Sequence, residues 1–189
     1  MNRGYLHVAA TAVTLLSLSA WFAPAPRLLW NASQSAPVGL YRIDPGAAPM
    51  VGDWVAIEPP AELAAYMARR KYLPRGVPLI KRVAALPGAR LCRSGVFVTV
   101  DGRAVARALA RDRAGRPLPV WLGCRIVRPR EIFLINAAPD SLDGRYFGPL
   151  PTTGLLGPAH PILTRDASGA PLRWRPSGRD LAFPRSEME

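Results

Sequence analysis

The sequence predicts a mainly β fold with one short helix and an N-terminal transmembrane helix, and three patterns support this. From residue 30 onward, glycine and proline interrupt the chain every few residues and leave only short apolar runs. Alternation is clearest in residues 96–100, Val-Phe-Val-Thr-Val, which end at an Asp-Gly turn, as strands often do. Before residue 24, one long apolar run stands in place of these short ones.

The long run covers residues 5–23 and contains no Asp, Glu, Lys or Arg. A helix of that length is about what is needed to cross a bilayer, and Arg3 in front of it favours a cytoplasmic N-terminus. A cleaved signal peptide is the alternative, because Ser17 and Ser19 form a small-residue cleavage pattern. In both cases the rest of the chain is expected outside the cytoplasm.

We expect an anchor over residues 1–24, a folded domain over 25–166 and a loosely ordered basic tail over 167–189. One helix is expected over residues 59–73, with Pro59 and Pro60 in its first turn. Arg69 and Arg70 fall in its last turn, at the negative end of the helix dipole. The expected strands lie at residues 52–59, 79–86, 95–102, 124–129 and 131–136.

A net charge of +12 suits an anionic partner, either nucleic acid or a lipid surface. The basic residues are scattered, however, and the sequence has no RNP-type aromatic motif, zinc-binding spacing or DNA-binding helix pair. Two cysteines and two histidines, with His7 in the apolar N-terminal run, do not form a metal-ligand set. We expect no nucleic-acid partner, no metal and no cofactor.

The two cysteines are Cys92 and Cys124. In an oxidising compartment they would form a disulfide, which contributes roughly 3–4 kcal/mol by closing the loop between them. Two unpaired buried thiols are the alternative.

Lysine is rare in this chain, because Lys71 and Lys81 are the only lysines among 25 basic residues. Lys81 lies in the apolar stretch PLIKRVAALPG, residues 78–88. Burial there would lower its pKa and let it lose a proton near neutral pH, which arginine cannot do. A lysine that snorkels from a strand is the structural alternative.

Two serines are candidate partners for such a base. Ser33 and Ser35 precede Pro37 and Gly39 in NASQSAPVGLYRI, residues 31–43, where a stiff turn would expose a hydroxyl. An ordinary loop is the alternative. A histidine-based triad is not expected, since His160 lies in a loop-like stretch and is expected at the surface.

Four stretches together resemble the boxes of the Ser/Lys signal peptidases, in the family's order. NASQSAPVGLYRI resembles the nucleophile box, in which serine and then proline closely follow a membrane anchor. LIKRVAALPG, residues 79–88, resembles the lysine box, and GDWVAI, residues 52–57, resembles the strand between the two. PDSLDGRYFGPLP, residues 139–151, resembles the late box, with Ser, Asp and Arg at two-residue steps.

The resemblance implies a role for each matching residue. Ser35 would be the nucleophile and Lys81 the general base. Ser33 would donate its hydroxyl to the oxyanion beside the backbone N–H of Ser35. Ser141 would orient the Lys81 ammonium.

The resemblance also implies a signal-peptidase-like β fold with a structural ion pair between Asp143 and Arg145 near the site. Ala36 and Asn136 depart from the pattern of the general leader peptidases, which have methionine after the serine and an acidic start to the late box. The chain also lacks their large additional β domain. These departures favour a specialised substrate over general secretory processing.

The form S-x-P-x-G-L-Y and the stretch RPLPVWLGC, residues 116–124, resemble the conjugative-transfer branch, the TraF type. That resemblance implies a single-pass inner-membrane endopeptidase that contacts membrane lipids and faces the periplasm. Its substrate would be a membrane-tethered pilin precursor, bound as an added strand, cut after small residues and, in this branch, able to be cyclised.

Three alternatives stay open at this point. One is a general signal peptidase I for secreted proteins. Another is a self-cleaving repressor of the LexA kind, although a hydrophobic segment occupies the place of its DNA-binding helices. The third is a non-enzymatic, membrane-anchored basic module, for which arginines such as Arg111, Arg113 and Arg116 would be essential and Ser35 and Lys81 dispensable.

Overall fold

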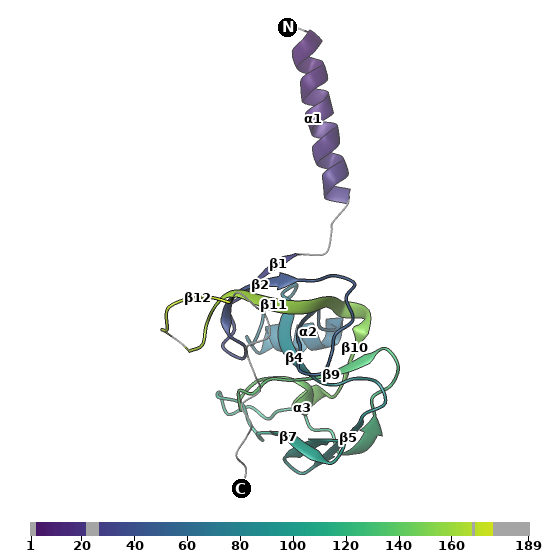
Figure 1. Ribbon diagram of the computed structural model, residues 1–189, viewed down its shortest axis with the longest axis vertical. Helices are drawn as coiled ribbons and strands as arrows, with labels where there is room; N and C mark the ends of the chain where they lie inside the picture. The colour runs from purple at the N-terminus through teal and green to yellow at the C-terminus, as the bar shows by residue number, and fades with distance from the viewer. Residues whose placement is uncertain (1–2, 22–26, 168, 176–189) are drawn as a thin grey trace.

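Two antiparallel sheets make up most of the computed structural model, which describes residues 3–21, 27–167 and 169–175 (Figure 1). The mainly β class is confirmed. The larger sheet has the strand order β1-β2-β11-β3-β4-β9-β10, with β12 paired to β11. Its strands are β1 (Leu28–Asn31), β2 (Val38–Ile43), β3 (Trp54–Ile57), β4 (Leu79–Ala85), β9 (Glu131–Ile135), β10 (Leu150–Pro151), β11 (Leu155–Arg165) and β12 (Arg173–Trp174).

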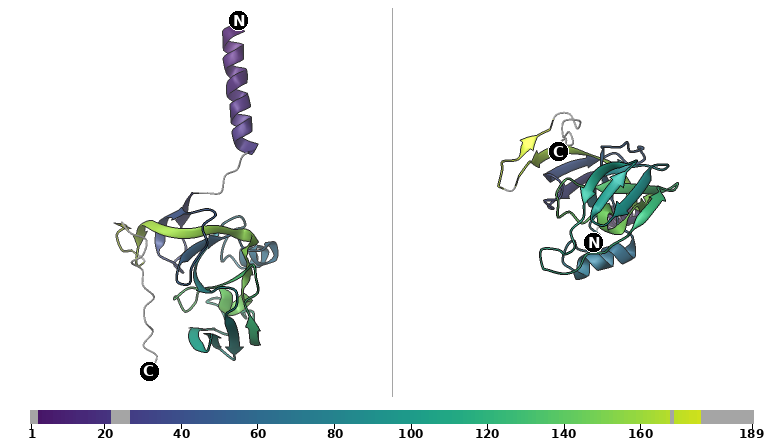
Figure 2. Two further views of the ribbon diagram at one scale, coloured as in Figure 1. Left: turned by 45° about the vertical axis from the view of Figure 1, so that its right-hand side comes forward. Right: turned by 90° about the horizontal axis from the view of Figure 1, so that it is seen from below.

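The smaller sheet, ordered β7-β6-β5-β8, lies at the end of the molecule away from α1 (Arg3–Trp21), as Figures 1 and 2 show. Cys92 and Cys124 are directly opposite each other on β5 and β8 and form a disulfide. Of the two alternatives for the cysteines, the structure therefore contains the disulfide. The strands of this sheet are β5 (Arg90–Ser94), β6 (Phe97–Val100), β7 (Arg103–Arg107) and β8 (Gly123–Ile126).

The strand that carries Lys81 is β4, which lies between β3 and β9 inside the larger sheet. All but one of its seven residues are buried. A strand buried on both faces has a nearly continuous apolar sequence instead of strict alternation, which explains the run LIKRVAA. Val83 of this strand packs with Val55 of β3 and with Met67 in one core cluster.

The helix expected over residues 59–73 is α2 (Ala61–Arg69), shorter than expected. Pro60 is its N-cap residue, and the chain turns away at Lys71, whose φ is 58°. Two further short elements follow β9, namely α3 (Gly144–Phe147) and the 3-10 turn η1 (Thr152–Gly154). The expectation of one short helix was therefore wrong, because a four-residue helix has too few positions for a periodic pattern.

The N-terminal helix α1 is drawn apart from the two sheets in Figure 1. In the described ranges of the chain, no helix is both long and apolar enough to span a membrane. The structure thus does not show the transmembrane helix expected over residues 5–23, and residues 22 and 23 lie outside the described ranges. Most of the tail expected over residues 167–189 also lies outside them.

The expectation that His160 lies in a loop-like stretch was wrong. His160 is part of the eleven-residue strand β11, where it is paired with Arg42, and its Nε2 lies 3.0 Å from the Asp44 carboxylate. Proline lacks the N–H of a ladder hydrogen bond and normally argues against a strand. β11 nevertheless contains Pro158 and Pro161, and its register shifts between Leu155 and Gly157 and again between Pro161 and Leu163.

Replacement of Gly39 by alanine should destabilise the larger sheet strongly. Gly39 has a φ of 148°, and a Cβ there would lie 2.0 Å from the carbonyl oxygen of Leu163 on β11. Because that atom belongs to a paired backbone, we expect Gly39→Ala to lower the free energy of unfolding by about 3 kcal/mol or more. Urea unfolding followed by circular dichroism measures the loss.

Gly46→Ala is the matched control, because Gly46 also has a positive φ, of 81°, but has open space where its Cβ would lie. Only the backbone cost of about 1–2 kcal/mol is expected there. Equal losses in the two variants would contradict the steric explanation.

Candidate active site

The turn between β1 and β2 carries both candidate serines. These strands form an antiparallel hairpin, and the buried side chain of Asn31 lies at the end of β1. The Asn31 amide donates hydrogen bonds to the carbonyl oxygens of Ser33, Ala36 and Pro37 at 2.9, 3.2 and 3.0 Å. Its Oδ1 accepts the N–H of Ser33 at 3.0 Å. Three hydrogen bonds donated by this side chain and one that it accepts therefore hold the path of the turn.

The hydroxyl groups of Ser33 and Ser35 lie side by side in this turn. Their Oγ atoms are 3.0 Å apart, and the backbone N–H of Ser35 donates to Ser33 Oγ at 3.3 Å. Below the turn, the buried Tyr41 donates its hydroxyl hydrogen to the Pro37 carbonyl at 2.7 Å. The two groups that the sequence assigned to an oxyanion, the Ser33 hydroxyl and the Ser35 N–H, are thus adjacent.

Lys81 extends from β4 to the same turn and is only 3% exposed. Its Nζ donates to Ser141 Oγ at 2.7 Å and to Ser35 Oγ at 3.3 Å. Burial lowers the pKa of Lys81 to about 8, although the nearby Asp143 carboxylate acts in the opposite direction. The alternative of a snorkelling lysine is wrong, since its ammonium is not in water. Lys81 can therefore lose its proton near neutral pH within hydrogen-bond reach of a serine hydroxyl.

A buried ion pair between Asp143 and Arg145 lies close to Lys81. Their side chains are 0% and 3% exposed, and Arg145 Nε and Nη2 donate to Asp143 Oδ1 and Oδ2 at 2.8 and 3.0 Å. Asp143 also accepts the backbone N–H of Arg145 as the N-cap residue of α3. The carboxylate raises the pKa of Lys81 and the guanidinium lowers it, so the pair leaves desolvation as the largest influence.

Two asparagines belong to this arrangement although the sequence did not single out their roles. Asn136 is fully buried, and its side chain accepts the N–H of Arg82 at 3.0 Å and donates to the carbonyl of Ile80 at 3.2 Å. It therefore holds the backbone of β4 on both sides of Lys81. Its only sequence signal was its place where an acidic residue was expected. For Asn31, the signal was an asparagine at the start of a turn.

A cleft of about 880 Å³ opens beside these groups. It is also lined by the end of α2 and by part of residues 109–118. Among the described residues, no cluster of His, Cys, Asp or Glu is placed to hold a metal ion. The structure brings together at the cleft four of the residues singled out from the sequence, while the disulfide lies apart on the smaller sheet. The four are Ser33, Ser35, Lys81 and Ser141.

The chain belongs to the S26 family of signal peptidases, because the family profile described as "Signal peptidase, peptidase S26" matches residues 2–163. The resemblance drawn from the four boxes is thereby confirmed, and the family places the chain among the peptidases.

Similar proteins include several that carry the name TraF. A conjugal transfer protein TraF of Agrobacterium tumefaciens is 40% identical over 144 residues, which cover 71% of this chain and 81% of that protein. A probable conjugal transfer protein TraF of Sinorhizobium fredii is 44% identical over 144 residues, covering 71% and 76%. Among solved structures, a signal peptidase I of Enterococcus faecalis is a distant neighbour, with 17% identity, a TM-score of 0.36 and coverage of 59% of this chain and 97% of that one.

Removal of one partner of the buried ion pair should destabilise the fold. Asp143→Asn would leave the Arg145 guanidinium buried without a counter-charge, which costs about 3–5 kcal/mol of unfolding free energy. Urea unfolding measures it. Asp44→Asn is the control, because Asp44 is 38% exposed and pairs with the exposed Arg42, so a loss of about 1 kcal/mol or less is expected. A small loss in Asp143→Asn would show that the pair adds little to stability.

Proposed function

We propose that the protein is a serine endopeptidase in which Ser35 is the nucleophile and Lys81 the general base. The observation that carries the proposal is the position of Lys81, a buried amine with a pKa of about 8 whose Nζ lies 3.3 Å from Ser35 Oγ. Ser141, at 2.7 Å, fixes the direction of that amine. A serine hydroxyl is a weak nucleophile unless an adjacent base takes its proton, and no other base is hydrogen-bonded to Ser35 in the described part of the chain.

The proposed reaction has two halves. Ser35 Oγ attacks the carbonyl carbon of the scissile peptide bond while Lys81 Nζ takes the hydroxyl proton. The Ser33 hydroxyl and the Ser35 N–H, which are hydrogen-bonded to each other in the structure, then both donate to the developing oxyanion. One such donor is typically worth ~3–4 kcal/mol in the transition state. Lys81 returns the proton to the departing amine, and the acyl group stays on Ser35. In the second half Lys81 activates water, or an amine of the substrate, to release the acyl group.

The proposed substrate is a membrane-tethered pilin precursor cut after small residues during conjugative transfer. The support is the similarity to proteins named for conjugal transfer. Resolution of the acyl-enzyme by the precursor's own N-terminal amine would give a cyclic product. A linear product with a free C-terminus as the only species would exclude that step.

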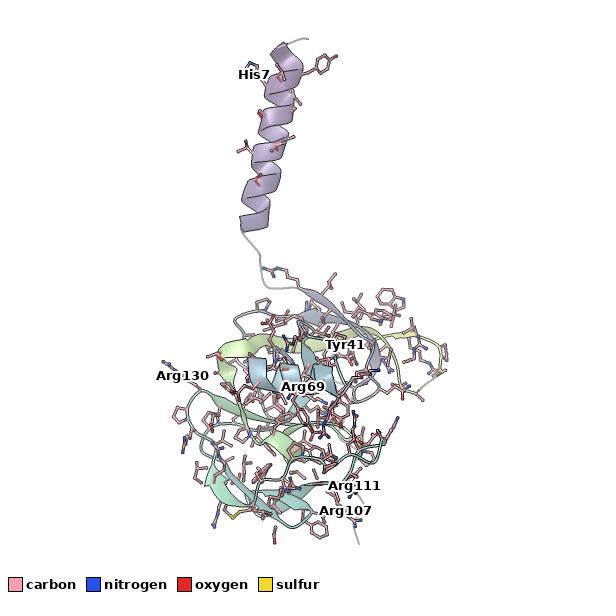
Figure 3. All side chains as sticks on the ribbon, turned by 180° about the vertical axis from the view of Figure 1, so that it is seen from behind. His7, Tyr41, Arg69, Arg107, Arg111 and Arg130 are labelled. Atoms are coloured by element: carbon pink, nitrogen blue, oxygen red, sulfur yellow. A yellow bond between two sulfur atoms is a disulfide. The ribbon has the colours of Figure 1, made fainter. Side chains whose placement is uncertain are left out.

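The non-enzymatic basic module is less well supported by the surroundings of its three arginines. Arg113 forms an ion pair with Asp140, and Arg116 binds Asp112 at 2.7 Å. Arg111 donates to the carbonyl of Gly115. Two of the three charges are thus neutralised within the protein, which weakens an anion-binding surface. Figure 3 shows Arg111 and Arg107 at the end of the molecule remote from α1.

The proposal includes a location at the inner membrane, with the catalytic domain in the periplasm. The disulfide supports a compartment outside the cytoplasm, because structural disulfides persist where conditions are oxidising. Attachment to the lipid rests on the sequence of residues 5–23 alone, since the described helices supply no membrane span. Retention in the membrane fraction after alkaline extraction tests the attachment.

Replacement of either member of the dyad should abolish processing of a co-expressed pilin precursor. Mass spectrometry of the precursor and product compares wild type with Ser35→Ala, Lys81→Ala and Lys81→Arg. Because arginine cannot act as a base near neutral pH, Lys81→Arg should fail as completely as Lys81→Ala, with a rate loss of about 10³-fold or more. Arg111→Ala should process normally. Cleavage by Lys81→Arg would contradict the dyad.

The pH dependence should follow the neutral form of Lys81. Since its pKa is about 8, kcat/KM for a peptide substrate should rise about tenfold per pH unit below that value and level off above it. Asp140 raises the pKa of Lys81 through its negative charge, so Asp140→Asn should move the midpoint to lower pH. A flat profile from pH 6 to 9 would show that another group is the base.

A further inference from the structure

The cleft beside the candidate dyad has more positive than negative charge around it. Apart from Lys81, its lining includes Arg70, Lys71, Arg113 and Arg116, against the two acids Asp112 and Asp140. Four cations less two anions leave an excess of two positive charges. The cleft therefore attracts an anionic group before any particular contact is considered.

Both acids of the cleft are already held by other side chains. Asp112 accepts hydrogen bonds from the Tyr72 hydroxyl and from Arg116 Nε, and Arg70 Nη1 lies 4.0 Å from it. The hydrogen bond from the Tyr72 hydroxyl, and after it those from Arg116, keep the pKa of Asp112 well below its usual range. Asp140 is paired with Arg113. Neither carboxylate is therefore free to neutralise Lys71.

Lys71 is the cation in the cleft that the structure leaves unpaired. It is exposed, and no side chain in the described part of the chain binds its ammonium. By contrast, Arg70 stacks 4.7 Å from the Tyr66 ring centroid and donates to the carbonyl of Pro117 at 2.7 Å. The unpaired ammonium among the residues that line the cleft thus belongs to Lys71.

The backbone conformation of Lys71 is one at which glycine would be the expected residue. It follows the C-cap of α2 with a φ of 58°, and its N–H bonds to the Ala68 carbonyl at 3.0 Å. Glycine is the usual residue at such a helix end, and this chain has glycine at twelve other described positions of positive φ. Here it has one of its only two lysines, at a conformational cost of about 1–2 kcal/mol. Arg69 already places a positive charge in the last turn, so the helix dipole does not require Lys71.

We propose that Lys71 is a substrate subsite that binds a carboxylate of the precursor segment lying in the cleft. This inference rests on the proposed peptidase function and adds a preference to it. The precursor would carry an aspartate or glutamate close to the small residues at the cut. The contact with the substrate is equally strong in the ground state and in the transition state. It therefore lowers KM and leaves kcat unchanged.

Internally quenched peptides with amidated C-termini test the subsite. They share one small-residue cleavage site and carry Glu, Gln or Lys at one position, placed on either side of the cut in turn. In wild type, the KM of the Glu peptide should be about two- to fivefold below that of the Gln peptide on one side of the cut. The difference should shrink as salt is added. A Gln peptide with a free C-terminus shows whether Lys71 binds a C-terminal carboxylate or the carboxylate of an acidic side chain.

Two substitutions change the charge at residue 71: one removes it and the other reverses it. Lys71→Gly suits the positive φ and should not lower the melting temperature, yet it should abolish the preference for Glu. Lys71→Glu should reverse the preference toward the Lys peptide. Arg69→Ala is the matched control, because Arg69 is the neighbouring exposed cation on α2 (Figure 3) and does not line the cleft. It should keep the wild-type ratio of KM values.

Fluorescence anisotropy of the same peptide sequences, labelled with the fluorophore alone and bound to Ser35→Ala, keeps the subsite testable without cleavage. If no peptide is cut by wild type but the Glu peptide binds more tightly and depends on Lys71, the subsite stands and the peptidase proposal fails. If the peptides are cut with equal KM, or if Lys71→Gly retains the preference for Glu, the subsite is overturned and the peptidase proposal stands.

Discussion

Keeping the amine of Lys81 inside the protein is the constraint on which the rest of the site depends. A buried amine favours its neutral form, but a carboxylate in direct contact would restore the charge. Arg145 binds both oxygens of Asp143, and the hydrogen-bond partners of the Lys81 amine in the described part of the chain are two serine hydroxyls. The ion pair thus keeps the Asp143 carboxylate bound to a guanidinium instead of to the amine of Lys81.

The backbone around the two reacting side chains is held by amide groups instead of charges. Asn31 fixes the turn that carries Ser35, and Asn136 fixes the strand that carries Lys81. An amide can donate and accept at once without adding a charge to the site. A carboxylate at either position would lack the donors and would add a negative charge near the amine. Neutral supports are therefore consistent with the proposed role of Lys81 as a base, because they add no negative charge that would raise its pKa.

The sequence predicted those elements of the fold in which the local residue pattern is typical of the environment that the element occupies. The run around Lys81 was recognised as a strand, because a central strand needs continuous apolar residues. The strand around His160 was missed, because it contains Pro158 and Pro161, and proline normally argues against a strand. Lys81, Ser33 and Ser35 were singled out from the composition and the turn pattern, and the resemblance of boxes assigned their roles and added Ser141. Asn31 was not singled out. Its role depends on carbonyl groups whose positions exist only after the turn has formed.

The disulfide between Cys92 and Cys124 has a consequence for the order in which the protein matures. The cysteines are 32 residues apart in sequence, and the stretch between them contains residues 109–118, which contribute to one wall of the cleft. Until the thiols are oxidised, that wall lacks its covalent closure and has a larger ensemble of open conformations. A chain in a reducing compartment would thus lack the covalent link that closes this wall beside the proposed dyad. In the proposed periplasmic location, oxidation would then close this wall where the protein meets its proposed substrates.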